Sequence, residues 1–144
     1  MLDFEIFTAA LRHVFSQFVG LKDLTSEALA ALPEKYQSIT AKMEISGDTQ
    51  GTLWLNISHP GVVIAMKKLD VPNTNEDRML MDTAGELLNI IAGSAQRNSQ
   101  VRYDFSLPSA YKGDSYPLRF DNETTKSARR FIFEDFEALL ILEQ

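Results

Sequence analysis

The chain has 144 residues, a formal net charge of −6 and no cysteine. This length suits a single domain, residues 1–144, and the missing cysteine excludes thiol chemistry and cysteine-based zinc sites. The acidic balance disfavours nucleic acid and anionic membranes as partners, because neither polyanion gains counterion release from an acidic protein. No signal peptide or bilayer-spanning run is recognised, so we expect a cytoplasmic protein. The histidines, His13 and His59, fall in different predicted elements, and we expect no metal site.

Two helices are predicted at the start of the chain. Apolar residues at helical spacing predict the first helix over residues 4–18. Thr25 or Ser26 could cap a short second helix over residues 25–32, which a proline would end.

Strand-like alternation begins after residue 36. Residues 39–45 and 51–58 alternate apolar and polar side chains on either side of a Gly-Asp turn, which predicts a β-hairpin. Trp54 points away from the apolar face of its strand. It marks either a partner surface or, as we prefer, an aromatic residue covered within the sheet.

Helical and then strand-like patterns fill the rest of the chain. A short helix is predicted over residues 61–69, and a long helix from Thr74 or Asn75 to about Ser99. Further strands are predicted over residues 101–105, 116–120, 129–133 and 138–142. These elements predict one α+β domain, a two-layer arrangement of a mostly antiparallel sheet with helices packed on it.

The long helix carries a polar stripe. At about 100° per residue, Asp82, Glu86, Asn89 and Gly93 fall within roughly 60° of one another, opposite a continuous apolar face. Gly85 lies beside the stripe. A glycine inside a helix costs about 1 kcal/mol relative to alanine, so two of them suggest that something approaches this backbone closely.

Taken alone, the Glu-x-x-Asn pair is a weak signal, because solvated polar residues are common on helices. Asp82 and Glu86 lie one turn apart and could form an acid/base pair, but no pocket is indicated for them. The sequence contains no nucleophile elbow, no phosphate-binding glycine loop and no paired-histidine metal motif.

The pattern Asp82-x-x-x-Glu86-x-x-Asn89, followed by Gly93 and later by Pro108, resembles the signature of the CheC/CheX/FliY family of response-regulator phosphatases. The order of hairpin, short helix and motif helix is also similar to that family from about residue 38 to residue 113. Two-site members carry a second Glu-x-x-Asn, which this chain lacks. It therefore looks like the single-site CheX branch.

This resemblance implies a substrate and roles for the stripe. The substrate would be the aspartyl phosphate of a CheY-like receiver domain, whose own Mg²⁺ serves the reaction, so we expect no cofactor in this chain. Asn89 would hold the attacking water and Glu86 would pair with the receiver's lysine, while Asp82 would support the contact. Gly93 would leave room for the partner, and Pro108 would shape a neighbouring loop. Positioning of this kind suits phosphoryl transfer. The family also implies a homodimer.

Two other classes of function stay open. The same helix face could dock on a receiver or another signalling protein without hydrolysis, which would make the chain an adaptor. A small-molecule-binding domain would need a deep apolar pocket, for which the sequence gives no sign.

Overall fold

The computed structural model describes residues 2–18, 20, 25–72, 76–113 and 118–144. Its helices and strands are, in chain order, α1 (Phe4–Phe18), β1 (Thr25–Leu29), β2 (Ile39–Gly47), β3 (Gly51–Ile57), α2 (His59–Lys68), α3 (Asp77–Arg97), β4 (Tyr103–Phe105), β5 (Ser109–Lys112), β6 (Lys126–Ile132) and β7 (Glu137–Glu143). Within these ranges, no helix is both long and apolar enough to cross a membrane.

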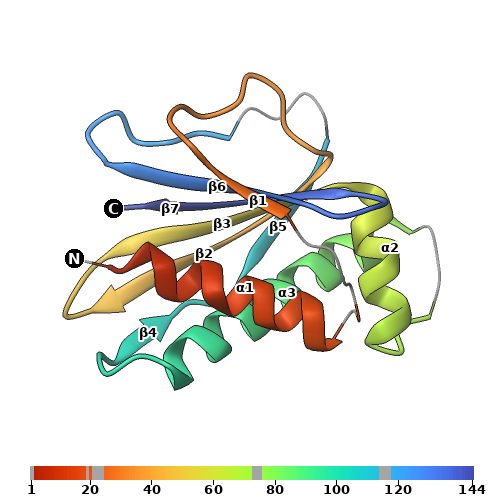
Figure 1. The fold of residues 1–144 in the computed structure, drawn as a ribbon, viewed down its shortest axis with the longest axis horizontal. Helices are drawn as coiled ribbons and strands as arrows, with labels where there is room; N and C mark the ends of the chain where they lie inside the picture. The colour runs from red at the N-terminus through yellow and green to blue at the C-terminus, as the bar shows by residue number, and fades with distance from the viewer. Residues whose placement is uncertain (1, 19, 21–24, 73–75, 114–117) are drawn as a thin grey trace.

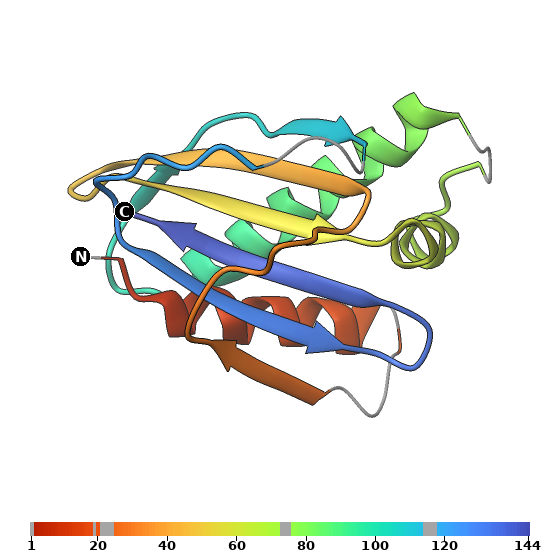
Figure 2. The ribbon, with the colours of Figure 1, turned by 90° about the horizontal axis from the view of Figure 1, so that it is seen from above.

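The strands form one antiparallel sheet in the order β1-β6-β7-β3-β2-β4, and β5 also pairs with β2. Helices α1 and α3 lie along one face of this sheet, and α2 stands at one end of it (Figures 1 and 2). The predicted α+β arrangement of helices on a mostly antiparallel sheet is therefore confirmed.

The hydrophobic core lies between the sheet and helices α1 and α3. Residues of β2 alternate as predicted: Ile39, Ala41, Met43 and Ile45 are all buried on the helix side. They pair in register with the apolar residues of β3, so that Ala41 lies opposite Leu55. The predicted hairpin is thus confirmed, and it supplies the floor on which α3 packs.

A second, smaller cluster covers the other face of the sheet. Trp54 is 5% exposed and packs edge-on against Phe120, with ring centroids 5.2 Å apart. Ala128, Leu139 and Ile141 complete the cluster. Trp54 is therefore a covered sheet residue, the interpretation that we preferred.

The helix predicted over residues 25–32 is wrong, because β1 occupies residues Thr25–Leu29 as a strand. It pairs along its whole length with β6, and Arg130 of β6 forms an ion pair with Glu27 at 3.2 Å. An isolated helix this short is unstable, and the hydrogen bonds offered by a neighbouring strand outweigh small differences in helix propensity.

Other predictions also differ from the structure. Strand β5 was not predicted, since no strand was expected between residues 105 and 116. Residues 118–120 of the predicted strand 116–120 are irregular, and residues 116 and 117 lie outside the described residues. Thr74 and Asn75, the residues at which the long helix was predicted to start, also lie outside the described residues. The described part of α3 begins at Asp77.

Candidate functional site

Helix α3 packs against the sheet and against α1 through a broad buried face. That face confirms the predicted apolar side opposite the polar stripe and includes Leu80, Ala84, Leu87, Leu88, Ile91 and Ala95. Near the start of the helix, the Lys112 ammonium of β5 donates a hydrogen bond to the Asp77 carboxylate. The helix is therefore anchored on the sheet, and its remaining face is fixed in direction.

That remaining face presents the three polar residues of the stripe. Asp82, Glu86 and Asn89 are exposed, and they line one surface hollow of about 320 Å³ together with Gly85 and Pro108. Five of the six residues that the sequence singled out thus meet at one place. Exposure leaves all three polar side chains accessible to a macromolecular partner.

The polar side chains of this hollow differ in their interactions within the chain. Arg78 Nε lies 3.9 Å from Asp82 Oδ2, an exposed pair spaced one helical turn apart. Such pairs contribute only about 0.3–0.5 kcal/mol. Within the described residues, no hydrogen bond or ion pair engages the side chain of Glu86 or Asn89. These two groups are therefore available for contacts with another molecule.

The wall of the hollow opposite α3 is an edge strand with an extra residue. Ile45 of β2 lies opposite Phe105, whereas Lys42 lies opposite Ser109. Two residues of β2 therefore face three residues of the edge chain, 106–108. This is a β-bulge, a feature found at sheet edges that re-aims side chains and accommodates proline, which has no N–H to donate. Strands β4 and β5 are in effect one strand, interrupted by this bulge.

The bulge brings Pro108 against the helix at Gly85. A Cβ atom built on Gly85 would lie 3.3 Å from Pro108 Cγ, closer than most real Cβ contacts. Glycine at this position therefore lets the proline pack directly on the helix backbone. The sequence singled out both residues without relating them, and the structure shows that they touch the same hollow.

Gly93 is placed differently. It lies one turn beyond Asn89, is not among the residues that line the hollow, and a Cβ there would meet only the flexible Arg97 tip at 3.6 Å. Conversely, Met81 and Ala110 line the hollow but were not predicted. Met81 lies one helical turn before Gly85, so the helical spacing could have indicated it, whereas Ala110 belongs to the unpredicted strand β5.

The two helix glycines predict opposite responses to alanine. Gly93→Ala is expected to raise the free energy of unfolding by about 0.5–1 kcal/mol, because the new methyl meets only the Arg97 tip at an ordinary contact distance and helix propensity improves. Gly85→Ala is expected to gain nothing or to lose stability, because the methyl presses on Pro108 and cancels that benefit. Urea unfolding of both variants measures the difference. An equal increase in the free energy of unfolding of both variants would show that Pro108 moves aside at no cost and would contradict the prediction.

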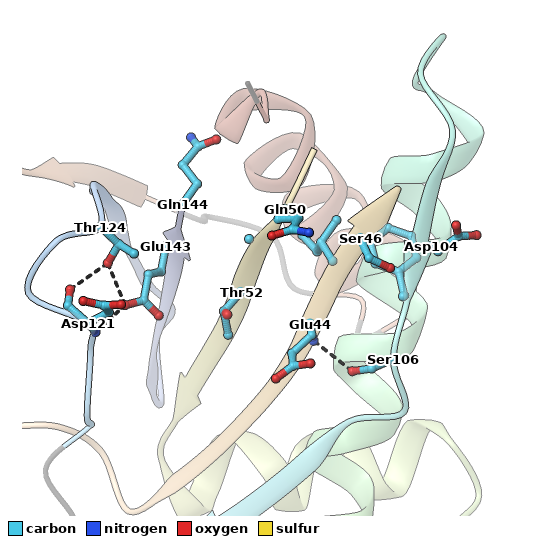
Figure 3. Close-up of a pocket in the computed structure, with 13 residues that line it drawn as sticks. Glu44, Ser46, Gln50, Thr52, Asp104, Ser106, Asp121, Thr124, Glu143 and Gln144 are labelled. Atoms are coloured by element: carbon cyan, nitrogen blue, oxygen red, sulfur yellow. Dashed lines mark hydrogen bonds between the residues drawn. The ribbon is translucent and has the colours of Figure 1, made fainter. Parts of the chain in front are cut away.

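A larger hollow, of about 650 Å³, lies at the other face of the sheet (Figure 3). Its walls carry four carboxylates, those of Glu44, Asp104, Asp121 and Glu143. The Glu143 carboxylate, in a residue only 7% exposed, accepts hydrogen bonds from the Asp121 N–H at 2.7 Å and the Thr124 hydroxyl at 2.8 Å. This carboxylate thus serves to hold the turn before β6. Across the described ranges, no group of three or more metal-ligating side chains is placed to hold a metal ion.

The fold, helices packed on a mostly antiparallel sheet, is that of the CheC/CheX/FliY class of chemotaxis proteins. The model of the family described as chemotaxis phosphatase CheX matches residues 39–133. The chain belongs to this CheX family, as the sequence resemblance indicated. A comparison with curated proteins gave no match.

Solved structures of the same class are similar over nearly the whole chain. Chemotaxis protein CheX from Desulfovibrio desulfuricans has a TM-score of 0.82 at 16% identity, covering 97% of each chain. CheX from Vibrio vulnificus has a TM-score of 0.80 at 19% identity, covering 96% of this chain and 95% of that one. A CheX-CheY-BeF3-Mg²⁺ complex from Borrelia burgdorferi gives 0.77 at 15% identity and covers all of both chains. At these identities the similarity establishes the fold.

Proposed function

We propose that this chain speeds hydrolysis of the aspartyl phosphate of a CheY-like receiver domain in chemotaxis or a related two-component pathway. The observation that carries the proposal is that Glu86 and Asn89 are exposed side by side on α3, in one hollow, with no partner among the described residues. Membership of a family named for chemotaxis phosphatase activity supports the reaction class. The Borrelia burgdorferi complex with CheY supports the class of partner.

In this proposal Asn89 positions the attacking water. The water oxygen forms a bond to phosphorus while the bond to the aspartyl oxygen breaks, which gives inorganic phosphate and a free carboxylate. A side-chain amide both accepts and donates hydrogen bonds, so it can orient a water without adding negative charge beside the phosphoryl group. Positioning and charge stabilisation supply most of the rate in phosphoryl transfer. The Mg²⁺ belongs to the receiver.

Glu86 has a different role. Its negative charge would repel the phosphoryl group, so it is not suited to hold the water there. In this proposal Glu86, one helical turn from Asn89, forms an ion pair with a lysine at the edge of the receiver's active site. Desolvated charge pairs at protein interfaces fix orientation and contribute to affinity. Asp82, already close to Arg78, supports the contact from the next turn.

A phosphate-release assay against the receivers of the source organism tests this function. Each receiver is phosphorylated, freed of phosphodonor and followed with and without the chain. We expect faster phosphate release from at least one receiver. Binding of a phosphorylated receiver without faster release would instead support a signalling adaptor, and the phosphatase proposal would then be wrong.

A further inference from the structure

Leu107, in the bulge beside the candidate site, is the most exposed large apolar residue of the described chain. Its exposed fraction is 88%, compared with 42% for Val101 and 38% for Ile132. Single exposed apolar residues are common on protein surfaces, so exposure alone indicates nothing. Leu107 is also absent from both hydrophobic clusters, and so its side chain contributes no core packing.

The backbone that carries Leu107 is held in place on both sides. Ser106 N–H donates to the Glu44 carbonyl at 2.9 Å, and the Glu44 N–H donates to Ser106 Oγ at 2.8 Å. The Ser106 hydroxyl in turn donates to the Leu107 carbonyl at 3.1 Å. On the other side, Pro108 has a fixed φ and packs towards Gly85. Little backbone freedom is therefore left to lose when Leu107 becomes buried in a complex.

The position of Leu107 relates it to the hollow. Its neighbour Pro108 lines that hollow, and consecutive Cα atoms are about 3.8 Å apart. A stable protein partner covers about 800 Å² of each surface. Leu107 does not itself line the hollow, but a receiver seated over Glu86 and Asn89 is expected to extend over the bulge, where it meets an apolar side chain on a hydrogen-bonded backbone.

We propose that Leu107 is an apolar anchor for the receiver, packing against an apolar patch beside the phosphorylated aspartate. The inference rests on the proposed function and separates the residues that bind the receiver from the residue that positions the water. Leu107 supplies affinity, because burial of an apolar side chain is equally favourable before and during the reaction. Such uniform binding lowers KM without changing kcat.

Leu107→Ser tests the anchor, with Val101→Ser as the matched control. Val101 is also an exposed apolar residue, but it lies before β4 and does not line the hollow. Phosphate release is measured against increasing concentrations of the receiver that the parent protein dephosphorylates. We expect Leu107→Ser to raise KM about tenfold or more with kcat unchanged, which is the effect of withdrawing a buried leucine. Val101→Ser is expected to keep both constants.

An unchanged KM in Leu107→Ser would overturn the anchor, and so would an equal rise in both variants. If Leu107→Ser altered only the oligomeric state in sedimentation, with KM unchanged, Leu107 would be a self-association contact and the proposal would be wrong. Measuring Asn89→Ala on the same receiver distinguishes failure of the anchor proposal from failure of the proposed function. If Asn89→Ala loses activity while Leu107→Ser has the parent's KM, only the anchor proposal is wrong. If Asn89→Ala keeps the parent's activity, the proposed function itself is wrong.

Discussion

Asn89→Ala is expected to lower the kcat for receiver dephosphorylation by about 10²–10³-fold. This is the usual loss when one prepositioned polar group is removed from a reaction that depends on orientation and charge stabilisation. The alanine cannot hold the water in line, while Glu86 and Leu107 still bind the receiver. We therefore expect KM to change little, so that single-turnover phosphate release at saturating chain shows the whole effect.

The fold is expected to survive this change. Asn89 is exposed, and alanine has the higher helix propensity, so thermal unfolding should shift slightly upward. Asn122→Ala is the matched control, because Asn122 is an exposed asparagine in the turn before β6, outside the hollow. If both variants dephosphorylate the receiver at the parent's rate, Asn89 takes no part in the reaction.

Glu86→Lys is expected to raise KM for the receiver by about 100-fold. The substitution replaces an attractive ion pair with two facing ammonium groups, and close charge pairs at interfaces carry coupling energies of about 1.5–7 kcal/mol. Because the loss comes from repulsion between two like charges, it should shrink as salt screens that repulsion. Titrating the variant against the receiver at low and high ionic strength measures both effects.

Glu134→Lys separates a local contact from a general effect of charge. It makes the same change in net charge in the exposed turn between β6 and β7, away from the residues that line the hollow. We expect this control to bind the receiver nearly as the parent does. A similar loss in both variants would mean that overall charge, and not an ion pair at Glu86, governs binding.

Much of the fold could be predicted because its signals are local. Helix α1 has the bounds that apolar spacing predicted, and alternation predicted both strands of the β2–β3 hairpin. The polar stripe of α3 was predicted for the same reason, since helical periodicity alone separates Glu86 and Asn89 from the buried face. Their chemical roles came from the family resemblance and stay predictions.

The features that could not be predicted depend on long-range pairing. Residues 25–29 carry cap-like and helix-forming side chains, and only β6, some hundred residues later, makes them a strand. The bulge arises from a one-residue offset between the pairings of β4 and β5 with β2, which no local pattern records. For that reason the contact between Gly85 and Pro108 was visible only in the structure.

The most direct test of the central claim is a structure of this chain bound to its receiver, loaded with Mg²⁺ and BeF3⁻ as a stand-in for the phosphoryl group. We expect the Asn89 amide to lie within about 3.2 Å of a water, or of its expected position, in line with the beryllium and the aspartyl oxygen. A complex in which the α3 hollow faces away from the beryllium would contradict the proposed function.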